Sequence, residues 1–328
     1  WNERFYFSKP GKVIIKKTDS STNAITITPA GGELIDGAST LLEKSQYGSS
    51  SLVSMGAGWS IYAEFGIDVK TPLPKFFMDG MLISNGTDTA NDINFHSGKC
   101  RDNADSDNIE LTTTWTKKMD ESWVAGNNAG GRPTGVNYVV DTWYHCFVIA
   151  KPDGTTDAGF DTSVTATNLL ADATGYTLYR RVGSIRTVAT PAIVSLLQFI
   201  AREIGGFVRE FRWIESNAID LNQNVNAATP PTPLNLLYVP AGVVTQAIIF
   251  AQSVFVSATA QFFLCEPGVG DVDGNFRIYG SNTGQWYIMT NGASPAVVHY
   301  GSHQIAAGGH NTVTVWTTGW QDFVRLPS

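Results

Sequence analysis

Short runs of apolar and polar residues alternate along the whole chain, separated by Gly, Pro, Asn and Asp. Residues 12–16 are rich in β-branched side chains, and residues 24–28 alternate with a period of two, which predicts strands. Residues 51–54 and 58–62 predict two more strands. Turn signals lie between these runs at residues 29–32 and at Asp36-Gly37.

The pattern continues to the C-terminus. Residues 117–124 predict a short helix, begun by Thr116 and ended before Gly126. Residues 142–150 predict an almost wholly apolar strand. Further strands are predicted at residues 177–185, 193–200, 206–213, 234–239, 245–250, 261–265, 276–279, 285–289, 297–300, 312–317 and 319–325.

These elements predict an all-β protein with β-sandwich-like domains. A length of 328 residues suggests two or three domains. We expect a small N-terminal β-motif at 1–70, a central β-rich module at 71–228 and a C-terminal β-sandwich domain at 229–328. The last boundary follows Pro230-Pro-Thr-Pro233, a run expected to interrupt any ladder or helix.

Composition narrows the classes of function. Only 16% of residues are charged and the net charge is −7, with no Lys/Arg run longer than two, which argues against a nucleic-acid partner. The longest apolar stretch, near residues 243–255, is too short and too interrupted by Gln246 and Gln252 for a membrane span. We therefore expect neither nucleic-acid binding nor membrane insertion.

Three cysteines without a CxxC motif predict buried free thiols, formed in a reducing cytoplasm: Cys100, Cys146 and Cys265. Because the chain starts at Trp1 rather than Met, we interpret it as a processed or truncated piece of a protein with an N-terminal attachment region.

Residues 24–37 (AITITPAGGELIDG) and 51–62 (SLVSMGAGWSIY) resemble a small β-motif that recurs in bacteriophage tail fibre and tail spike proteins. That motif has a T-I-like strand, an I-[DN]-G turn and a strand ending in G-x-x-W-x-[IV]. Here Gly58 and Trp59 are adjacent, whereas the motif usually separates them by one or two residues. The resemblance covers about 40 residues.

The chain from about residue 98 onward resembles a module found in many phage structural proteins, often in their tail region. The similar stretches are CRD (100–102), GNNAGG (126–131), TWYH (142–145), DAGFDTS (157–163), YRRVGSI (179–185) and TGWQD (318–322). This resemblance implies a location in the virion, after assembly in the host cytoplasm, without fixing which part.

Polysaccharide cleavage, as performed by some tail spikes, requires two carboxyl groups about 5 to 9.5 Å apart in a cleft. The candidates are Asp102, Asp105, Asp107 and Glu110, or Asp157 and Asp161. All lie in polar, loop-like runs, where carboxylates usually form turns, and the long β-helix repeat typical of tail spike depolymerases is missing. We therefore expect no catalytic residues and no cofactor.

Histidines give no better case for catalysis. There is no Gly-x-Ser-x-Gly motif, and His145 lies within an apolar strand, where we expect a hydrogen-bonded core or interface side chain. His299, His303 and His310 could meet across a turn or around a trimer axis and hold a metal. Without nearby Cys or carboxylate ligands, we interpret them as ordinary turn histidines.

Asp271, Asp273 and Asn275 place oxygen ligands at alternate positions, as at the start of a calcium loop. The acidic ligand expected further along is replaced by Asn282. A hairpin turn at Asp273-Gly274 explains the same residues.

Aromatic and amide side chains near the C-terminus are candidates for sugar binding, because rings stack on sugar faces and amides bind hydroxyls: Tyr279, Asn282, Trp286 and Tyr287. Trp in a strand is more often part of a core. Trp316 and Trp320 share parity along one strand and are expected on a single buried face.

We therefore expect the chain to form part of a phage tail fibre or receptor-binding assembly, without enzymatic activity. The expected partners are two further copies in a homotrimer, other virion tail proteins and a host surface glycan or protein. The alternatives are a purely structural tail hub, collar or capsid decoration protein, and a glycan-degrading tail spike.

Overall fold

The computed structural model describes residues 11–16, 25–43, 49–65, 73–190, 193–204, 208–214, 219–224, 229–267, 276–303 and 311–323. These residues are almost entirely β-structured, which confirms the predicted all-β class. The chain divides into two compact units, Trp1–Thr71 and Pro72–Ser328. No helix within the described ranges is long and apolar enough to cross a membrane.

The first unit forms two small antiparallel sheets, ordered β1-β4-β5 and β2-β3. Its strands are β1 (Lys12–Lys16), β2 (Ile25–Ile27), β3 (Leu41–Glu43), β4 (Ser49–Ser54) and β5 (Trp59–Phe65). A core of three buried residues, Ile35, Leu52 and Trp59, holds the sheets together.

The first part of the second unit contains three sheets and a short helix. The sheets are ordered β10-β9-β6, β12-β11-β8-β7 and β14-β13-β15-β16. The elements are β6 (Met78–Gly80), β7 (Ile83–Asn85), β8 (Asp92–Phe95), β9 (Gly98–Arg101), β10 (Asn108–Leu111), β11 (Trp115–Ser122), β12 (Ala129–Arg132), β13 (Trp143–Ala150), β14 (Thr156–Asp161), α1 (Thr167–Asp172), β15 (Leu178–Thr190) and β16 (Ile193–Leu196).

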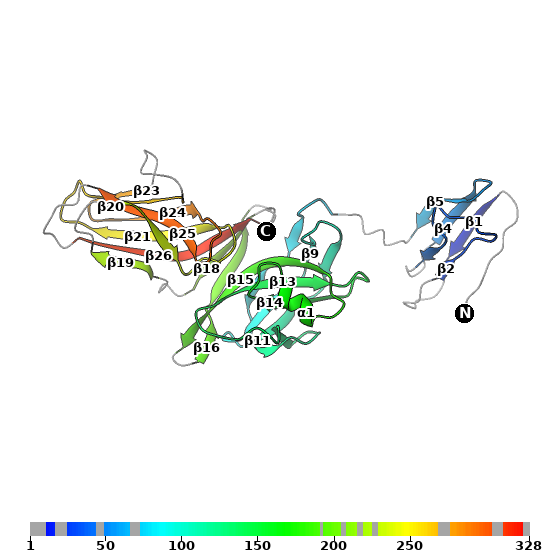
Figure 1. The fold of residues 1–328 in the computed structure, drawn as a ribbon, viewed down its shortest axis with the longest axis horizontal. Coiled ribbons are helices and arrows are strands. Elements are labelled where there is room, and N and C mark those ends of the chain that lie inside the picture. Colours follow the sequence, from blue (N-terminus) through cyan, green and yellow to red (C-terminus); the bar gives the residue numbers. More distant parts are fainter. Residues whose placement is uncertain are drawn as a thin grey trace. The chain divides into compact units, whose positions relative to one another are not determined.

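The second part is sandwich-like. One sheet is ordered β17-β18-β26-β21-β24, with β19 also on β26, and the other is ordered β20-β25-β22-β23. The strands are β17 (Phe199–Ile204), β18 (Val208–Trp213), β19 (Ile219–Asn224), β20 (Thr229–Leu236), β21 (Gln246–Val254), β22 (Gln261–Cys265), β23 (Phe276–Tyr279), β24 (Asn282–Met289), β25 (Ala296–His303) and β26 (Thr312–Phe323). Figure 1 shows β26, in red, running beside β19 and β21.

One continuous core joins the two parts of the second unit. It extends from Met78 in β6 to Trp320 in β26. The predicted boundary after residue 228 falls between β19 and β20, and the sheet built around β26 takes strands from both sides of it. The predicted boundary after residue 70 lies one residue from the division between the two units.

The predicted helix at residues 117–124 is wrong, because β11 occupies this segment. Lys117 and Met119 are buried while Lys118 is not, which is the period of a strand. The alternation of apolar and polar residues was not visible in the sequence, because one of the two inward-facing side chains is a lysine.

The expectation that the proline run would interrupt a ladder is also wrong. Strand β20 contains Pro230, Pro231 and Pro233, and it pairs with β25 across a register shift between Thr229 and Thr232. Strand β20 lies at the edge of its sheet and has a neighbour, β25, on one side. A proline on the open side, which has no backbone N–H, removes no hydrogen bond to another strand.

The two tryptophans of β26 do not share a buried face. Trp320 is fully buried against Phe211, with ring centroids 4.8 Å apart, whereas Trp316 is half-buried and lies 5.5 Å from Phe250. A register shift opposite Ile248 and Ile249 changes the phase of β26 between the tryptophans. The even spacing of the two tryptophans in the sequence does not show this register shift.

Candidate functional site

A cleft of about 670 Å³ lies within the second unit, between the start of β13 and loops of the sandwich-like part. Its lining comes from five separate stretches of chain, at residues 141–145, 162–164, 186, 237–242 and 294–295. Trp143 and His145 come from β13, residues 162–164 from the loop before α1, and Leu237, Gly242 and Pro295 from the sandwich-like part. Clefts lined by a few polar groups and an aromatic wall are the usual form of small-molecule sites.

Arg186 of β15 is the cation of the cleft, and it is only 4% exposed. Its Nη2 donates to Oδ1 of Asp141 at 3.1 Å, and its Cζ lies 4.4 Å from the ring centroid of Tyr238. Its Nε and Nη1 are buried and have no hydrogen-bond partner within the protein. A buried donor left unpaired costs about 1–3 kcal/mol, and both of these atoms are closed off from the solvent that fills the cleft.

Asp141 forms an ion pair with Arg186, but its side chain is 68% exposed, so solvent weakens the attraction. Its backbone has φ of +56°, in the left-handed region that Asp tolerates better than most residues. The turn aims a single solvated carboxylate at Arg186. The cleft therefore contains one cation and one acid.

His145 lies on the same face of β13 as Trp143, and its Nδ1 is 2.9 Å from the Oγ of Ser184. Arg181 donates to the same Oγ at 3.0 Å. Because an Arg can only donate, the hydroxyl oxygen of Ser184 accepts from Arg181 and also lies within hydrogen-bond distance of the His145 ring. Burial, reinforced by the charge of Arg181, lowers the pKa of His145 to about 3. His145 is thus a neutral, hydrogen-bonded side chain, as expected for a core histidine.

Trp143 forms an aromatic wall of the cleft. Its Nε1 donates to the carbonyl of Leu237 at 3.1 Å, which ties β13 to the sandwich-like part. Its ring packs against Trp213 and Trp320 at centroid distances of 5.9 and 5.5 Å. The ring is therefore fixed in position by the main core.

These groups suit binding better than bond cleavage. Among the described residues that line the cleft, Asp141 is the single carboxylate, whereas glycoside hydrolysis uses two. The other ionisable groups of the lining are the neutral ring of His145 and the guanidinium of Arg186.

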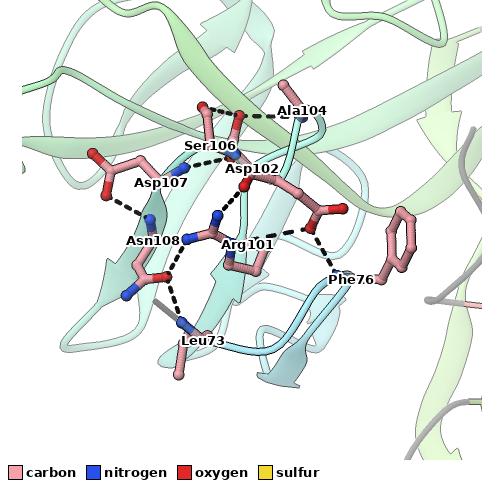
Figure 2. Close-up of polar contacts among 9 residues, drawn as sticks. Leu73, Phe76, Arg101, Asp102, Ala104, Ser106, Asp107 and Asn108 are labelled. Carbon is pink, nitrogen blue, oxygen red and sulfur yellow. Dashed lines mark hydrogen bonds and ion pairs between the residues drawn. The ribbon is translucent and has the colours of Figure 1, made fainter. Parts of the chain in front are cut away.

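The acids predicted as catalytic candidates near residue 102 hold a loop together (Figure 2). The carboxylate of Asp102 accepts from the backbone of Ala104, Ser106 and Asp107 and from the Ser106 hydroxyl, at 2.6–3.1 Å. Asp105 accepts from the Phe76 backbone at 2.7 Å. The carboxylate oxygens of Asp102 and Asp105 are therefore already engaged in hydrogen bonds that hold this loop.

The remaining predicted acids also have structural partners. Asp107 accepts from the Asn108 backbone at 2.7 Å, and Glu110 pairs with Lys99 on the surface at 3.0 Å. Asp157 pairs with the buried Lys117. Asp161 accepts from Ser163, Asn168 and Leu169, which fixes the start of α1.

The four predicted sugar-binding residues do not converge on one surface. Tyr279 is exposed in β23, and Asn282 begins β24. Trp286 is half-buried, with its ring 6.3 Å from that of Phe276. Tyr287 lies on the opposite face of β24, where its hydroxyl accepts from Arg212 at 3.0 Å. Their role in binding stays a prediction.

The predicted calcium ligands Asp271, Asp273 and Asn275 lie outside the described residues, as does His310. His299 pairs with Cys265 and Pro233 across β25, so it occupies a strand rather than a turn. Among the described residues, no group of three or more His, Cys, Asp or Glu side chains could hold a metal ion.

Arg186 was not recognised as a site residue from the sequence. It lies in a strand with no charged neighbour at a telling spacing, and its partners are 45 and 52 positions away.

Comparison with known proteins adds no relative. No protein-family model matches the chain, and a search of curated proteins finds no similar sequence. The case for function therefore depends on the residues and geometry described above.

Proposed function

We propose that this chain is a non-enzymatic component of a bacteriophage virion, part of a tail fibre or receptor-binding assembly that contacts the host cell surface as a homotrimer. The phage-like stretches at residues 24–62 and from residue 98 onward support this proposal. Further support comes from the small core of the first unit and from the cleft of the second unit, each taken by itself.

The first unit carries the main observation in favour of an assembly. Among its described residues, only three hydrophobic side chains form a buried core. Its exposed large hydrophobic side chains are Ile14, Leu34, Leu42, Met55 and Tyr62. The described core is small, and identical copies around a threefold axis would cover these side chains.

The second unit supports a binding role. Its core is extensive within a single chain, so it is a rigid support for the cleft at Trp143, His145 and Arg186. Three such clefts in one trimer would act together, because binding at one raises the effective concentration at the others. Sites of low individual affinity would then hold a particle to a cell.

The proposal is tested by locating and counting the protein. Antibodies against the chain should decorate the tails of intact particles in the electron microscope, and light scattering should give three times the chain mass of 35.5 kDa. The protein should also bind intact host cells, and purified surface glycan should compete.

Each alternative predicts a different result. Decoration of the capsid or collar without cell binding would favour the purely structural role. New reducing ends after incubation with host polysaccharide would favour the glycan-degrading tail spike. A monomer in dilute solution would contradict the trimer.

A further inference from the structure

The sheet built around β26 has an outer face, which is turned away from the core. Strands β19 and β21 lie beside β26 (Figure 1), and β24 follows on β21. Successive side chains of a strand point to opposite faces of a sheet. In β26, Val313 and Val315 are fully buried in the core, whereas Thr314 and Trp316 are only half-buried on the other side. The outer face therefore carries side chains that meet solvent.

The pairing of the strands places two aromatic rings in one row across this face. The row runs from β19 to β24 through Ile219, Trp316, Phe250 and Gln285. The ring centroids of Trp316 and Phe250 lie 5.5 Å apart, and both side chains are half-buried. Ile219 and Gln285, at the two ends of the row, are exposed. This aromatic row is thus a ridge of rings with solvent above it.

The next row along the same strands is polar and uncharged. It consists of Asn222, Thr314, Gln252 and Thr283. Asn222, Gln252 and Thr283 are exposed, and the hydroxyl of Thr314 donates to Oδ1 of Asn222 at 3.5 Å. The amide of Gln252 and the hydroxyl of Thr283 make no hydrogen bond with another described residue. This polar row therefore offers groups that can both donate and accept.

We propose that the outer face binds a stretch of uncharged polysaccharide across the aromatic row and the polar row. Aromatic rings give apolar area on which the faces of sugars can stack, and amide and hydroxyl groups exchange hydrogen bonds with sugar hydroxyls. This inference rests on the proposed function, because it names the chemistry of the host glycan that the assembly would contact.

The absence of charge in the two rows favours a neutral glycan over an acidic one. No residue of either row is ionisable. Further along the same sheet, Arg202 and Arg212 share the carboxylate of Glu210. An acidic sugar over the two rows would lose hydration without meeting a cation there, whereas a neutral sugar would not incur this cost.

The extent of the face favours a chain of sugars over a single sugar. Each row crosses four strands that are about 4.8 Å apart, so it is about 14 Å long. An open face contacts a sugar from one side only, in contrast to a pocket that surrounds its ligand. Several sugars must then bind together, and we expect affinity to rise with the length of the oligosaccharide.

The test measures binding of the full chain to an array of glucose, galactose and mannose oligosaccharides of increasing length, with oligogalacturonate as the charged counterpart. We expect at least one neutral hexasaccharide to bind at least tenfold more tightly than the corresponding disaccharide, and more tightly than oligogalacturonate. Binding of none of the neutral oligosaccharides, or tighter binding of oligogalacturonate, would overturn the proposal.

Variants assign the binding to the outer face. W316A should weaken hexasaccharide binding at least tenfold, and W316F, which keeps a ring, should weaken it less. Q252A should weaken binding severalfold, and it tests the site even if W316A does not fold, because Gln252 is exposed. The matched control is N235A, which removes an exposed amide from β20 in the other sheet and should leave binding unchanged. Unchanged binding by Q252A, or by a folded W316A, would overturn the proposal.

A second copy of the chain is the other occupant that the test recognises. If the outer face lay between copies, W316A would convert trimers to monomers in light scattering, and the wild-type protein would bind no neutral oligosaccharide. That result would overturn the glycan site.

The two levels of inference fail separately. Attachment to host cells without binding to any neutral oligosaccharide would overturn the glycan site and leave the virion role in place. Oligosaccharide binding by a protein that neither decorates particles nor attaches to cells would overturn the virion role instead.

Discussion

The Nζ of Lys117 lies 3.0 Å from the Oδ1 of Asp157, and both side chains are almost fully buried. The remaining ammonium hydrogens go to the carbonyl oxygens of Val124 and Gly126, at 2.8 and 3.1 Å. Asp157 in turn accepts from the backbone N–H of Gly126. This ion pair therefore anchors the segment that links β11 to β12 onto β14. Burial lowers the pKa of Lys117, and the neighbouring Asp157 opposes that shift.

Replacing Lys117 with Met should destabilise the second unit by about 3–5 kcal/mol, because the carboxylate of Asp157 would stay buried without its cation. Urea unfolding followed by far-UV circular dichroism measures this change. The matched control is K118M, which removes an exposed lysine paired with Glu121 and should cost less than about 1 kcal/mol.

A second variant separates the charge from the packing. The double variant K117M/D157N should be more stable than K117M alone, since Asn carries no unpaired charge. Equal stability of the single and double variants would show that Lys117 contributes through its aliphatic chain rather than through the ion pair.

Gly319 should not tolerate a side chain. A Cβ at this position would lie 2.0 Å from the carbonyl oxygen of Phe211, on the paired strand β18. G319A should therefore cost about 2–4 kcal/mol, because β18 and β26 would have to separate locally. G135A is the control, since nothing lies within 4 Å of a Cβ there. Equal unfolding midpoints for the two variants would contradict this packing.

Some short strands bounded by turns were predictable from their local residues. The predicted runs at 261–265 and 276–279 coincide with β22 and β23. The three cysteines were correctly predicted as buried free thiols. These features depend on local pattern, and local pattern is what a single sequence displays.

Features that depend on distant partners were not predictable. The helix expected at residues 117–124 is a strand because Asp157, 40 positions away, makes burial of Lys117 possible. The shared face of Trp316 and Trp320 failed because the register shift depends on pairing with β21. The cleft was not predictable for the same reason, since its lining comes from five separate stretches of chain.

The three cysteines should be unreactive in the native protein. All are buried, and burial raises the pKa of Cys100 to about 12 and that of Cys146 as well, so neither forms the reactive thiolate at pH 8. A thiol reagent such as dithionitrobenzoate should release no colour from folded protein and three equivalents in urea. Rapid reaction of any thiol in the folded state would contradict its burial.

His145 should make the fold sensitive to acid. Its pKa is lowered from 6.5 to about 3 in the folded chain, so between these values the unfolded chain takes up a proton that the folded chain does not. The contribution of His145 to stability is therefore full above pH 6.5 and falls as the pH drops toward 3, by up to about 5 kcal/mol. We expect urea midpoints of the wild-type protein to fall more steeply than those of H145Q between pH 7 and pH 4. Above pH 7 the difference between the two should stay constant, because neither state of the wild-type histidine carries a charge there. Parallel curves from pH 7 to pH 4 would mean that water or a rearrangement admits the proton, and that His145 is not held neutral in the folded chain.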